Sequence, residues 1–312
     1  MEISILLAEQ ILAMFLTMAV GFGVVRAGLF KTEDSRIISN MVVYICNPCV
    51  VVHSFQIELT DDKIKGLMIA IGLSVVVHMV LIIGSEILSF IFHFNSIEKA
   101  SIIYTNAGYL VIPLVGAVLG EEWVFYTTAF IRVQTVLMWT HGVKLIGQEK
   151  ELNIRKILCN PNVIAMIIGI ALFALEIRLP TVVDSCVSGF GDMISPASMM
   201  VIGMVIGDVD LKWVFRQKRP YLICLLRLIV FPLIAVVAFA GLERSGIHPD
   251  AEYILMIVLI ATSAPAAAMI TQLAQIYGKD SRYASVINVM SVIFCIITMP
   301  VMVLSYEMLI AL

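Results

Sequence analysis

Apolar residues run along this chain in ten long blocks that short polar breaks separate. The blocks are residues 4–25, 35–57, 66–92, 97–119, 123–147, 158–177, 181–207, 219–241, 251–276 and 280–310. Each block reaches the roughly 20 residues that a helix needs to cross a hydrocarbon core of about 30 Å. No stretch alternates as the strands of a barrel do. Because lipid offers no partner to backbone N–H and C=O groups, the pattern predicts an all-α membrane protein with ten transmembrane helices.

Composition and charge agree with this class and add an orientation. Of the 312 residues, 61% are hydrophobic and 14% are charged, against roughly 25% charged in soluble domains. The net charge is -3 and no basic stripe occurs, so we expect no nucleic-acid partner. Lysine and arginine gather in every second loop. The positive-inside rule then predicts both termini outside the cell (plasma) membrane and the loop at 148–157 in the cytoplasm.

Two pairs of prolines indicate an internal repeat. Pro48 and Pro196, in the second and seventh blocks, are 148 residues apart, and Pro113 and Pro265, in the fourth and ninth, are 152 apart. Five helices per half is an odd number, so the two halves must be inverted relative to each other. Matching Pro-interrupted helices in inverted halves are typical of secondary transporters and mark the binding site. The first repeat, the linker and the second repeat are residues 1–148, 149–157 and 158–312.

We expect the fourth and ninth helices to break near mid-membrane, at Pro113 and Pro265, and to form the binding site together. Broken ends would expose N–H groups that attract anions and carbonyls that suit a cation or a substrate donor. A repaired kink explains one such proline, but two at matching positions favour a site. The residues expected at this site are Asn106, Gly108, Pro113, Thr262, Ser263 and Pro265.

Two arginines lie inside apolar blocks. Arg132 and Arg227 are both near mid-depth, where a charge is expensive and usually functional. Each is suited either to a substrate carboxylate or to a structural ion pair with Glu86 or Asp192, and both interpretations stay open. Asp192 is also a candidate to carry a proton or ligate sodium as the coupling ion.

Other chemistry finds less support. The amides of Gln134 and Asn288 suit a neighbouring helix as well as a substrate. Cys46 and Cys49 have CxxC spacing but lack a thioredoxin-like context and a second pair for zinc. No nucleotide-binding or hydrolase motif occurs in the sequence. We therefore expect a protein that is not an enzyme and that holds no cofactor and no metal.

Several local patterns follow one another along nearly the whole chain. They are Pro48; Asn106, Gly108 and Pro113, with Asn and Pro seven residues apart; Asn160-Pro161-Asn162-Val163-Ile164-Ala165 followed by Gly169; Pro196 followed by Gly203; and Pro265. This ordered set resembles the auxin efflux carrier family, which includes plant auxin exporters and bacterial malonate- and malate-type carriers. The family is related to the bile acid/sodium symporters.

The resemblance implies a scaffold of helices 1, 2, 6 and 7, often dimeric, and a moving transport domain of helices 3–5 and 8–10. It implies elevator-type alternating access for small organic anions, helices 4 and 9 crossing at their prolines, and Asn106 as a carboxylate contact. Plant members carry a polar residue and a second proline where this chain has Ala266, Ala267 and Ala268. A bacterial carboxylate carrier therefore fits better than an auxin exporter.

We thus expect a homodimeric secondary active transporter of a mono- or dicarboxylate, with a proton or sodium as the candidate coupling ion. Two alternatives stay open. A sodium-coupled symporter of the bile-acid type predicts carbonyl-rich cation sites where the broken helices cross. A membrane sensor with a carrier-like fold predicts ligand binding without flux, because fold alone does not fix function.

Overall fold

The computed structural model describes residues 2–56, 60–147, 161–207 and 209–311, and this part of the chain is nearly all helical, with no strand. Five helical stretches within it are long and apolar enough to cross a membrane, and shorter apolar helices accompany them. The five are Thr32–Ser54, Asp61–Phe92, Thr181–Gly207, Arg219–Glu243 and Ser281–Ile310. They fall on predicted blocks, with ends that differ by a few residues.

Helices of the first half begin where the sequence offers caps. Thr60 accepts the N–H of Lys63 at the start of α4, and Asn95 and Glu98 form a capping box at the start of α5. The elements are α1 (Glu2–Arg26), η1 (Thr32–Asp34), α2 (Ser35–Met41), η2 (Val42–Cys46), α3 (Asn47–Ser54), α4 (Asp61–Phe92), α5 (Ser96–Ile103), α6 (Ala107–Val118), η3 (Glu121–Trp123), α7 (Val124–Leu137), η4 (Met138–Gly142) and α8 (Val143–Gly147).

Helices of the second half also begin at capping residues. Asp210 and Asp280 cap α13 and α18 through their carboxylates. The turn η5 is π-helical, a local widening that often occurs at functional positions. The elements are α10 (Pro161–Ala174), α11 (Thr181–Asp192), α12 (Ile194–Gly207), α13 (Leu211–Arg216), α14 (Arg219–Leu225), η5 (Leu226–Val230), α15 (Phe231–Glu243), α16 (Ala251–Ser263), α17 (Met269–Ile276) and α18 (Ser281–Ile310).

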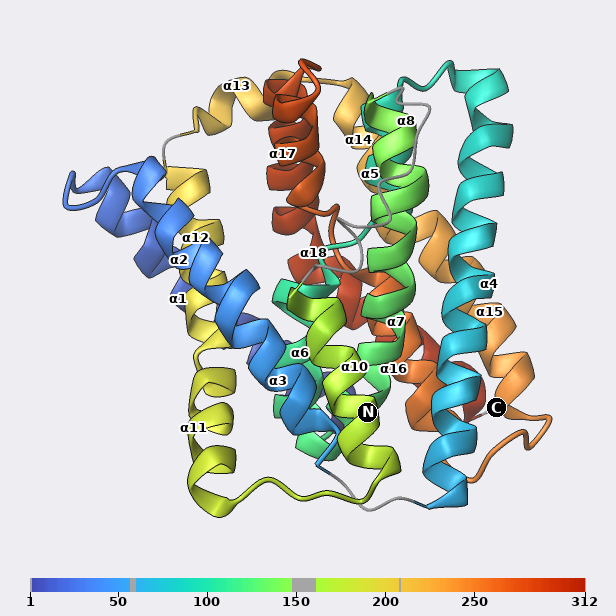
Figure 1. Cartoon of the computed structure of the whole chain (residues 1–312). Coiled ribbons are helices and arrows are strands. Elements are labelled where there is room, and N and C mark those ends of the chain that lie inside the picture. Colours follow the sequence, from blue (N-terminus) through green and yellow to red (C-terminus); the bar gives the residue numbers. More distant parts are fainter. Residues whose placement is uncertain (1, 57–59, 148–160, 208, 312) are drawn as a thin grey trace.

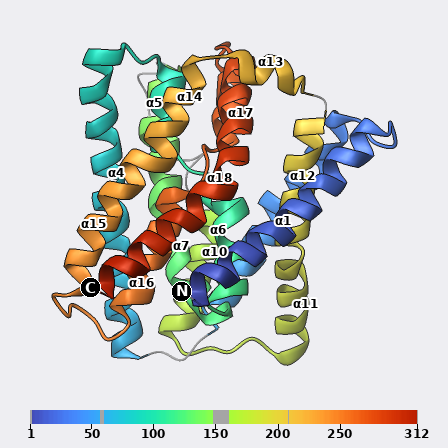
Figure 2. The same cartoon turned by 180° about the vertical axis from the view of Figure 1, so that it is seen from behind.

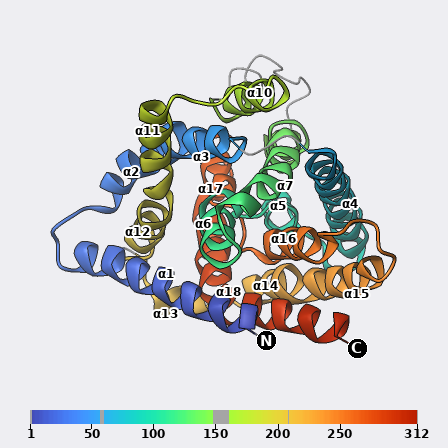
Figure 3. The same cartoon turned by 90° about the horizontal axis from the view of Figure 1, so that it is seen from below.

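The helices pack in two groups (Figure 1). The first group is α1–α3 with α10–α12, and the second is α4–α8 with α14–α18. The short helix α13 runs between them along the top of the view, and the reverse view shows the same division (Figure 2). From below, α6 lies at the middle of the molecule (Figure 3), and α6, α7 and α18 carry the contacts of the second group with α1, α3 and α12.

Glycines let the first group pack backbone to backbone. A Cβ on Gly203 of α12 would overlap the carbonyl oxygen of Met18 on α1, and one on Gly21 would overlap the carbonyl oxygen of Met200. Close approach through small residues is the usual way in which membrane helices gain packing without a hydrophobic driving force. Helices α1 and α12 therefore pack backbone to backbone, and we call this pair the spine of the first group.

The helix interruption in the fourth block does not lie where Pro113 predicts it. Helix α6 runs through Pro113, and the non-helical residues are 104–106 instead. Pro265, in contrast, does lie in the interruption between α16 and α17. A proline inside a helix removes one hydrogen bond, and α6 continues past that loss. Residues 104–106 leave the helix because other parts of the fold supply partners for their backbone.

Candidate functional site

The two interruptions lie against each other at the centre of the second group. Residues 104–106 separate α5 from α6, and residues 264–268 separate α16 from α17. Thr105 and Ala266 pair there as an isolated antiparallel bridge. Its hydrogen bonds run from the Asn106 N–H to the Pro265 carbonyl at 2.8 Å and from the Ala267 N–H to the Tyr104 carbonyl at 3.0 Å. We call this pairing the crossing.

Side chains from α7 and α18 hold the two central residues of the crossing. Gln134 accepts the N–H of Thr105 at 2.8 Å and donates to its carbonyl at 2.8 Å. On the other side, the N–H of Ala266 donates to the hydroxyl of Ser291 at 3.1 Å, and its carbonyl accepts from the amide of Asn288 at 2.6 Å. The amides of Gln134 and Asn288 thus bind neighbouring backbone, one of the two roles the sequence allowed them.

Arg227 binds the carbonyl ends of the helices that enter the crossing. This side chain comes from η5 and is fully buried. Its Nε donates to the carbonyl of Ala264 at 3.1 Å, and its two terminal nitrogens donate to the carbonyls of Ile102 at 3.1 Å and Thr262 at 2.8 Å. The C-termini of α5 and α16 carry unpaired carbonyls and partial negative charge, so a guanidinium suits them.

The N-terminal end of α6, the helix that leaves the crossing, does not receive such a side-chain partner from its own N-cap residue. Asn106 is the N-cap residue of α6, yet its side chain does not cap that helix. Asn106 is 5% exposed and lines a small cavity of about 10 Å³ between the two groups, which is room for about one water molecule. Pro265 also lines it, and Phe15 and Met18 of α1 and Met199 and Ile202 of α12 form the opposite wall.

A larger cavity of about 240 Å³ lies between α3, α6, η3 and α11. Pro113 and the polar side chains of His53, Glu121, Ser188 and Asp192 line it. The imidazole Nδ1 of His53 lies 3.0 Å from a carboxylate oxygen of Asp184, on the helix that also carries Asp192. Polar groups of both helix groups therefore face one space, at the end of α6 that is farther from the crossing.

Asn47 of α3 and Gly108 of α6 lie next to each other, one helical turn from residues that line this cavity. A Cβ on Gly108 would lie 3.7 Å from the amide nitrogen of Asn47. Asn47 lies one turn before Val50 on α3, and Gly108 lies one turn before Ile112 on α6, and both Val50 and Ile112 line the cavity. Asn47 and Gly108 thus meet between the large cavity and the crossing.

We call the boundary between the two helix groups the seam. Arg132 lies on α7, on the same helix face as Phe125, which contacts the first group at this seam. Phe125, two turns earlier on the same helix face, packs edge-on against Phe55 of α3, and its ring centroid lies 5.4 Å from that of Phe173 on α10. Arg132 is 7% exposed, and its Nε finds no acceptor among the described residues. A buried guanidinium with an unpaired donor is costly unless a ligand or water compensates it.

Comparison with known protein families identifies the chain. The profile of a family described as membrane transport protein matches residues 6–154 and 149–303, which together cover nearly all of the sequence. The chain belongs to this family, which is that of the auxin efflux carriers. The predicted resemblance is confirmed, and the apolar helices are those of a multi-pass membrane transporter. No curated protein matches the sequence of this transporter in a direct search.

The ion-pair interpretation of the buried arginines is wrong for Arg227, which binds backbone carbonyls instead. The two carboxylates predicted as partners are engaged or placed elsewhere in this transporter. Glu86 accepts from Lys99 at 2.7 Å on the outer part of the second group, and its side chain is 47% exposed. Asp192 is exposed and lines the larger cavity. Of the two arginines, Arg132 is the one with a buried donor, its Nε, that has no partner among the described residues.

Thr262 and Ser263 are buried behind the crossing. Thr262 is 1% exposed, and its hydroxyl donates to the carbonyl of Val258 in its own helix. Ser263 is 0% exposed, and its hydroxyl finds no partner among the described residues. Neither residue lines the small cavity, whose polar lining comes from Asn106. Both residues lie at the C-terminal end of α16.

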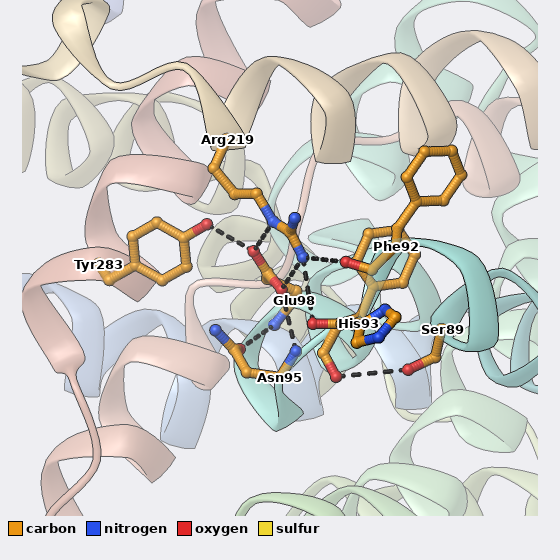
Figure 4. Close-up of polar contacts among 8 residues, drawn as sticks. Ser89, Phe92, His93, Asn95, Glu98, Arg219 and Tyr283 are labelled. Carbon is orange, nitrogen blue, oxygen red and sulfur yellow. Dashed lines mark hydrogen bonds and ion pairs between the residues drawn. The ribbon is translucent and has the colours of Figure 1, made fainter.

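One polar cluster of the transporter escaped sequence analysis (Figure 4). The Glu98 side chain, 3% exposed, accepts from Arg219 at 2.7 Å, from the Tyr283 hydroxyl at 2.7 Å and from the N–H of Asn95 at 2.9 Å. Arg219 also donates to the carbonyl of Phe92 at 2.6 Å. The cluster joins the α4–α5 corner to α14 and α18. The capping-box spacing of Asn95 and Glu98 was its only local signal, because the other partners are distant in sequence.

Proposed function

We propose that this membrane transporter is a secondary active carrier of small organic anions, mono- or dicarboxylates, which bind at the crossing. The observation that carries the proposal is that the helix ends at the crossing differ in their side-chain partners. Arg227 neutralises the carbonyl ends of α5 and α16, whereas the N-terminal end of α6 receives no cap hydrogen bond from the side chain of Asn106. Two positive helix ends directed at one point favour a carboxylate.

Asn106 gives this site its directed donor. Its amide is not engaged as a helix cap and lines the small cavity, where an N–H₂ group suits a carboxylate oxygen. Gly108 leaves room beside it, and Arg132 lies on the face of α7 toward the same seam, so we assign Arg132 the role of offsetting the substrate charge. The small volume of the cavity implies that the two groups separate before a carboxylate of several heavy atoms enters.

The proposed mechanism is elevator-type alternating access. In it, α5–α6 and α16–α17 are the broken fourth and ninth of ten transmembrane helices in two inverted five-helix repeats. The first group, with its glycine-packed α1–α12 pair, is the fixed scaffold, and the homodimer forms through it. The second group carries the site across the cell membrane, with both termini outside. Support comes from the seam between the groups, where both cavities lie.

Uptake by purified protein in proteoliposomes tests the function. A panel of radiolabelled mono- and dicarboxylates should contain a substrate, and uptake should be saturable. Asn106→Ala and Pro265→Ala should lose most of the uptake while remaining folded, because they remove the donor and the fixed bend at the site. Asn40→Ala, at an exposed asparagine, is the control and should transport normally.

Two results would contradict the proposal. Wild-type uptake rates in both site variants, with normal expression and folding, would move the site away from the crossing. Saturable binding of a carboxylate without any flux would favour the sensor over the carrier.

A further inference from the structure

We propose that the guanidinium of Arg227 is a built-in cation that occupies the carbonyl-lined site at the crossing, so that no sodium ion binds there. The proposal deepens the function above, since it concerns the coupling ion of the same site, but the occupancy itself can be tested without transport. It rests on where the three donors of Arg227 point and on the charge of the groups that they meet.

The three acceptors come from two helix ends that are far apart in sequence. Ile102 lies 125 residues before Arg227, and Thr262 and Ala264 lie 35 and 37 residues after it. Their carbonyl oxygens converge on one planar group at 2.8 to 3.1 Å. A set of unwound backbone carbonyls at the break of a transmembrane helix is the type of site at which secondary transporters hold sodium or a proton.

Electrostatics explains why a cation is needed at this point. Each helix C-terminus carries roughly half of a negative elementary charge, so the ends of α5 and α16 together balance about one positive charge. Neither end can be hydrated, because Arg227, Thr262 and Ser263 are each at most 1% exposed. A buried cation of unit charge with several oxygen partners is the arrangement that relieves both the carbonyls and the guanidinium.

The shape of arginine suits this role better than that of lysine. Its planar group directs five N–H donors in fixed directions, and three of its nitrogens each reach a different carbonyl. A lysine ammonium is a compact point charge on a flexible stem and would not span the same three acceptors. The π-helical turn η5 widens the helix at Arg227, which places the side chain at the level of the crossing.

The backbone of Thr105, the central residue of the first interruption, is satisfied without any cation. Gln134 engages both the N–H and the carbonyl of Thr105, so its neutral amide completes the backbone there. Within the described residues, the carbonyl oxygens of both halves of the crossing therefore accept hydrogen bonds from groups that belong to the chain itself. Transport by this protein should consequently proceed equally well with sodium or with an inert organic cation outside.

Thermal unfolding of purified protein tests the occupancy directly. The wild type should have the same Tm in sodium chloride and in choline chloride of equal ionic strength. Arg227→Ala should lose several degrees and regain most of the loss, saturably, on addition of millimolar guanidinium chloride, far below denaturing concentrations. Arg227→Lys should lie between the two. Arg132→Ala is the matched control, because it removes a buried arginine without orphaning carbonyls, and guanidinium should not restore its Tm.

Several results would overturn the proposal. They are a wild-type Tm that rises saturably with sodium, an Arg227→Ala variant as stable as the wild type, and equal rescue of both alanine variants. If Arg227→Ala does not fold, Arg227→Lys and the wild-type salt comparison decide. A lysine variant with the full wild-type Tm would contradict the three-carbonyl geometry, and a wild-type Tm that rises with sodium would contradict the built-in cation. Absence of organic-anion uptake in either salt would contradict the proposed function alone and would leave the thermal result to judge Arg227.

Discussion

The single carboxamide of Gln134 satisfies both backbone polar groups of Thr105, accepting the N–H and donating to the carbonyl at 2.8 Å each. The threonine hydroxyl donates to the same amide oxygen at 3.0 Å. Non-helical backbone at membrane depth persists only where the protein itself supplies such partners. Gln134 therefore compensates the loss of helical hydrogen bonds at the interruption before α6, next to Asn106.

Replacing Gln134 by leucine should destabilise the protein and abolish organic-anion uptake. The change orphans a buried N–H and a buried carbonyl, at about 1–3 kcal/mol each. Tm and uptake by reconstituted protein measure the effect. Thr135→Val is the control on the next residue, since the Thr135 hydroxyl donates only to the carbonyl of Ile131 in its own helix. A Gln134→Leu protein with wild-type Tm would show that the crossing does not need this amide.

A methyl group at Gly203 should loosen the spine of the first group. The added Cβ meets the backbone of α1 at Met18, which cannot rotate away as a side chain can. Overpacking of this kind costs about 1–3 kcal/mol, occasionally more, so Gly203→Ala should lower the Tm clearly. Gly23→Ala on α1 is the matched control, because no atom lies within 4 Å of its Cβ position. Equal Tm values for the two variants would mean that α1 and α12 are not packed as described.

Arg219→Met should destabilise the second group more than Lys99→Met does. Removing Arg219 leaves the Glu98 carboxylate, 3% exposed, with one charged partner fewer, whereas the partner of Lys99, Glu86, is 47% exposed and can be hydrated. Orphaning a buried charged group costs about 1–3 kcal/mol or more, but an exposed pair contributes only about 0–1 kcal/mol. Chemical or thermal unfolding of both variants measures the two losses of stability. A larger loss for Lys99→Met than for Arg219→Met would contradict the expected order.

The positions of the helices were predictable because the membrane imposes a strong local rule. The block predicted at 251–276 coincides with α16 and α17 together, and that at 280–310 differs from α18 by one residue at its start. Apolar length alone sets such limits. Asn106 and Pro265 were also predicted and do line one cavity, because an amide and a helix breaker inside an apolar block are local signals.

The partners of these residues were not predictable from local signals. Pro113 was expected to mark the interruption, but the break lies at residues 104–106, where Gln134, 29 residues from Thr105, binds the backbone. The acceptors of Arg227 are backbone carbonyls, which no side-chain pattern distinguishes, so an ion pair was the natural expectation. Which donor meets which acceptor is decided by the packing of helices that are distant in sequence.

A cysteine pair at Asn47 and Gly108 should lock the carrier. Asn47 belongs to the first group and Gly108 to the second, and a side chain at Gly108 would begin in ordinary contact, 3.7 Å from the Asn47 amide nitrogen. If the second group slides against the first during transport, a bridge between the two positions must stop it. In a background without native cysteines, mercuric ion should arrest most of the uptake by the double variant, and dithiothreitol should restore it.

The comparison for this experiment is the same double variant before cross-linking, with each single variant as a control for mercury bound to one thiol. Mass spectrometry of the peptides establishes that the bridge has formed. If the two groups move against each other, uptake should stop in the bridged protein alone. Uptake by the single variants should stay unchanged. Full uptake by bridged protein would show that substrate crosses without separation of Asn47 from Gly108, and the elevator mechanism would then be wrong.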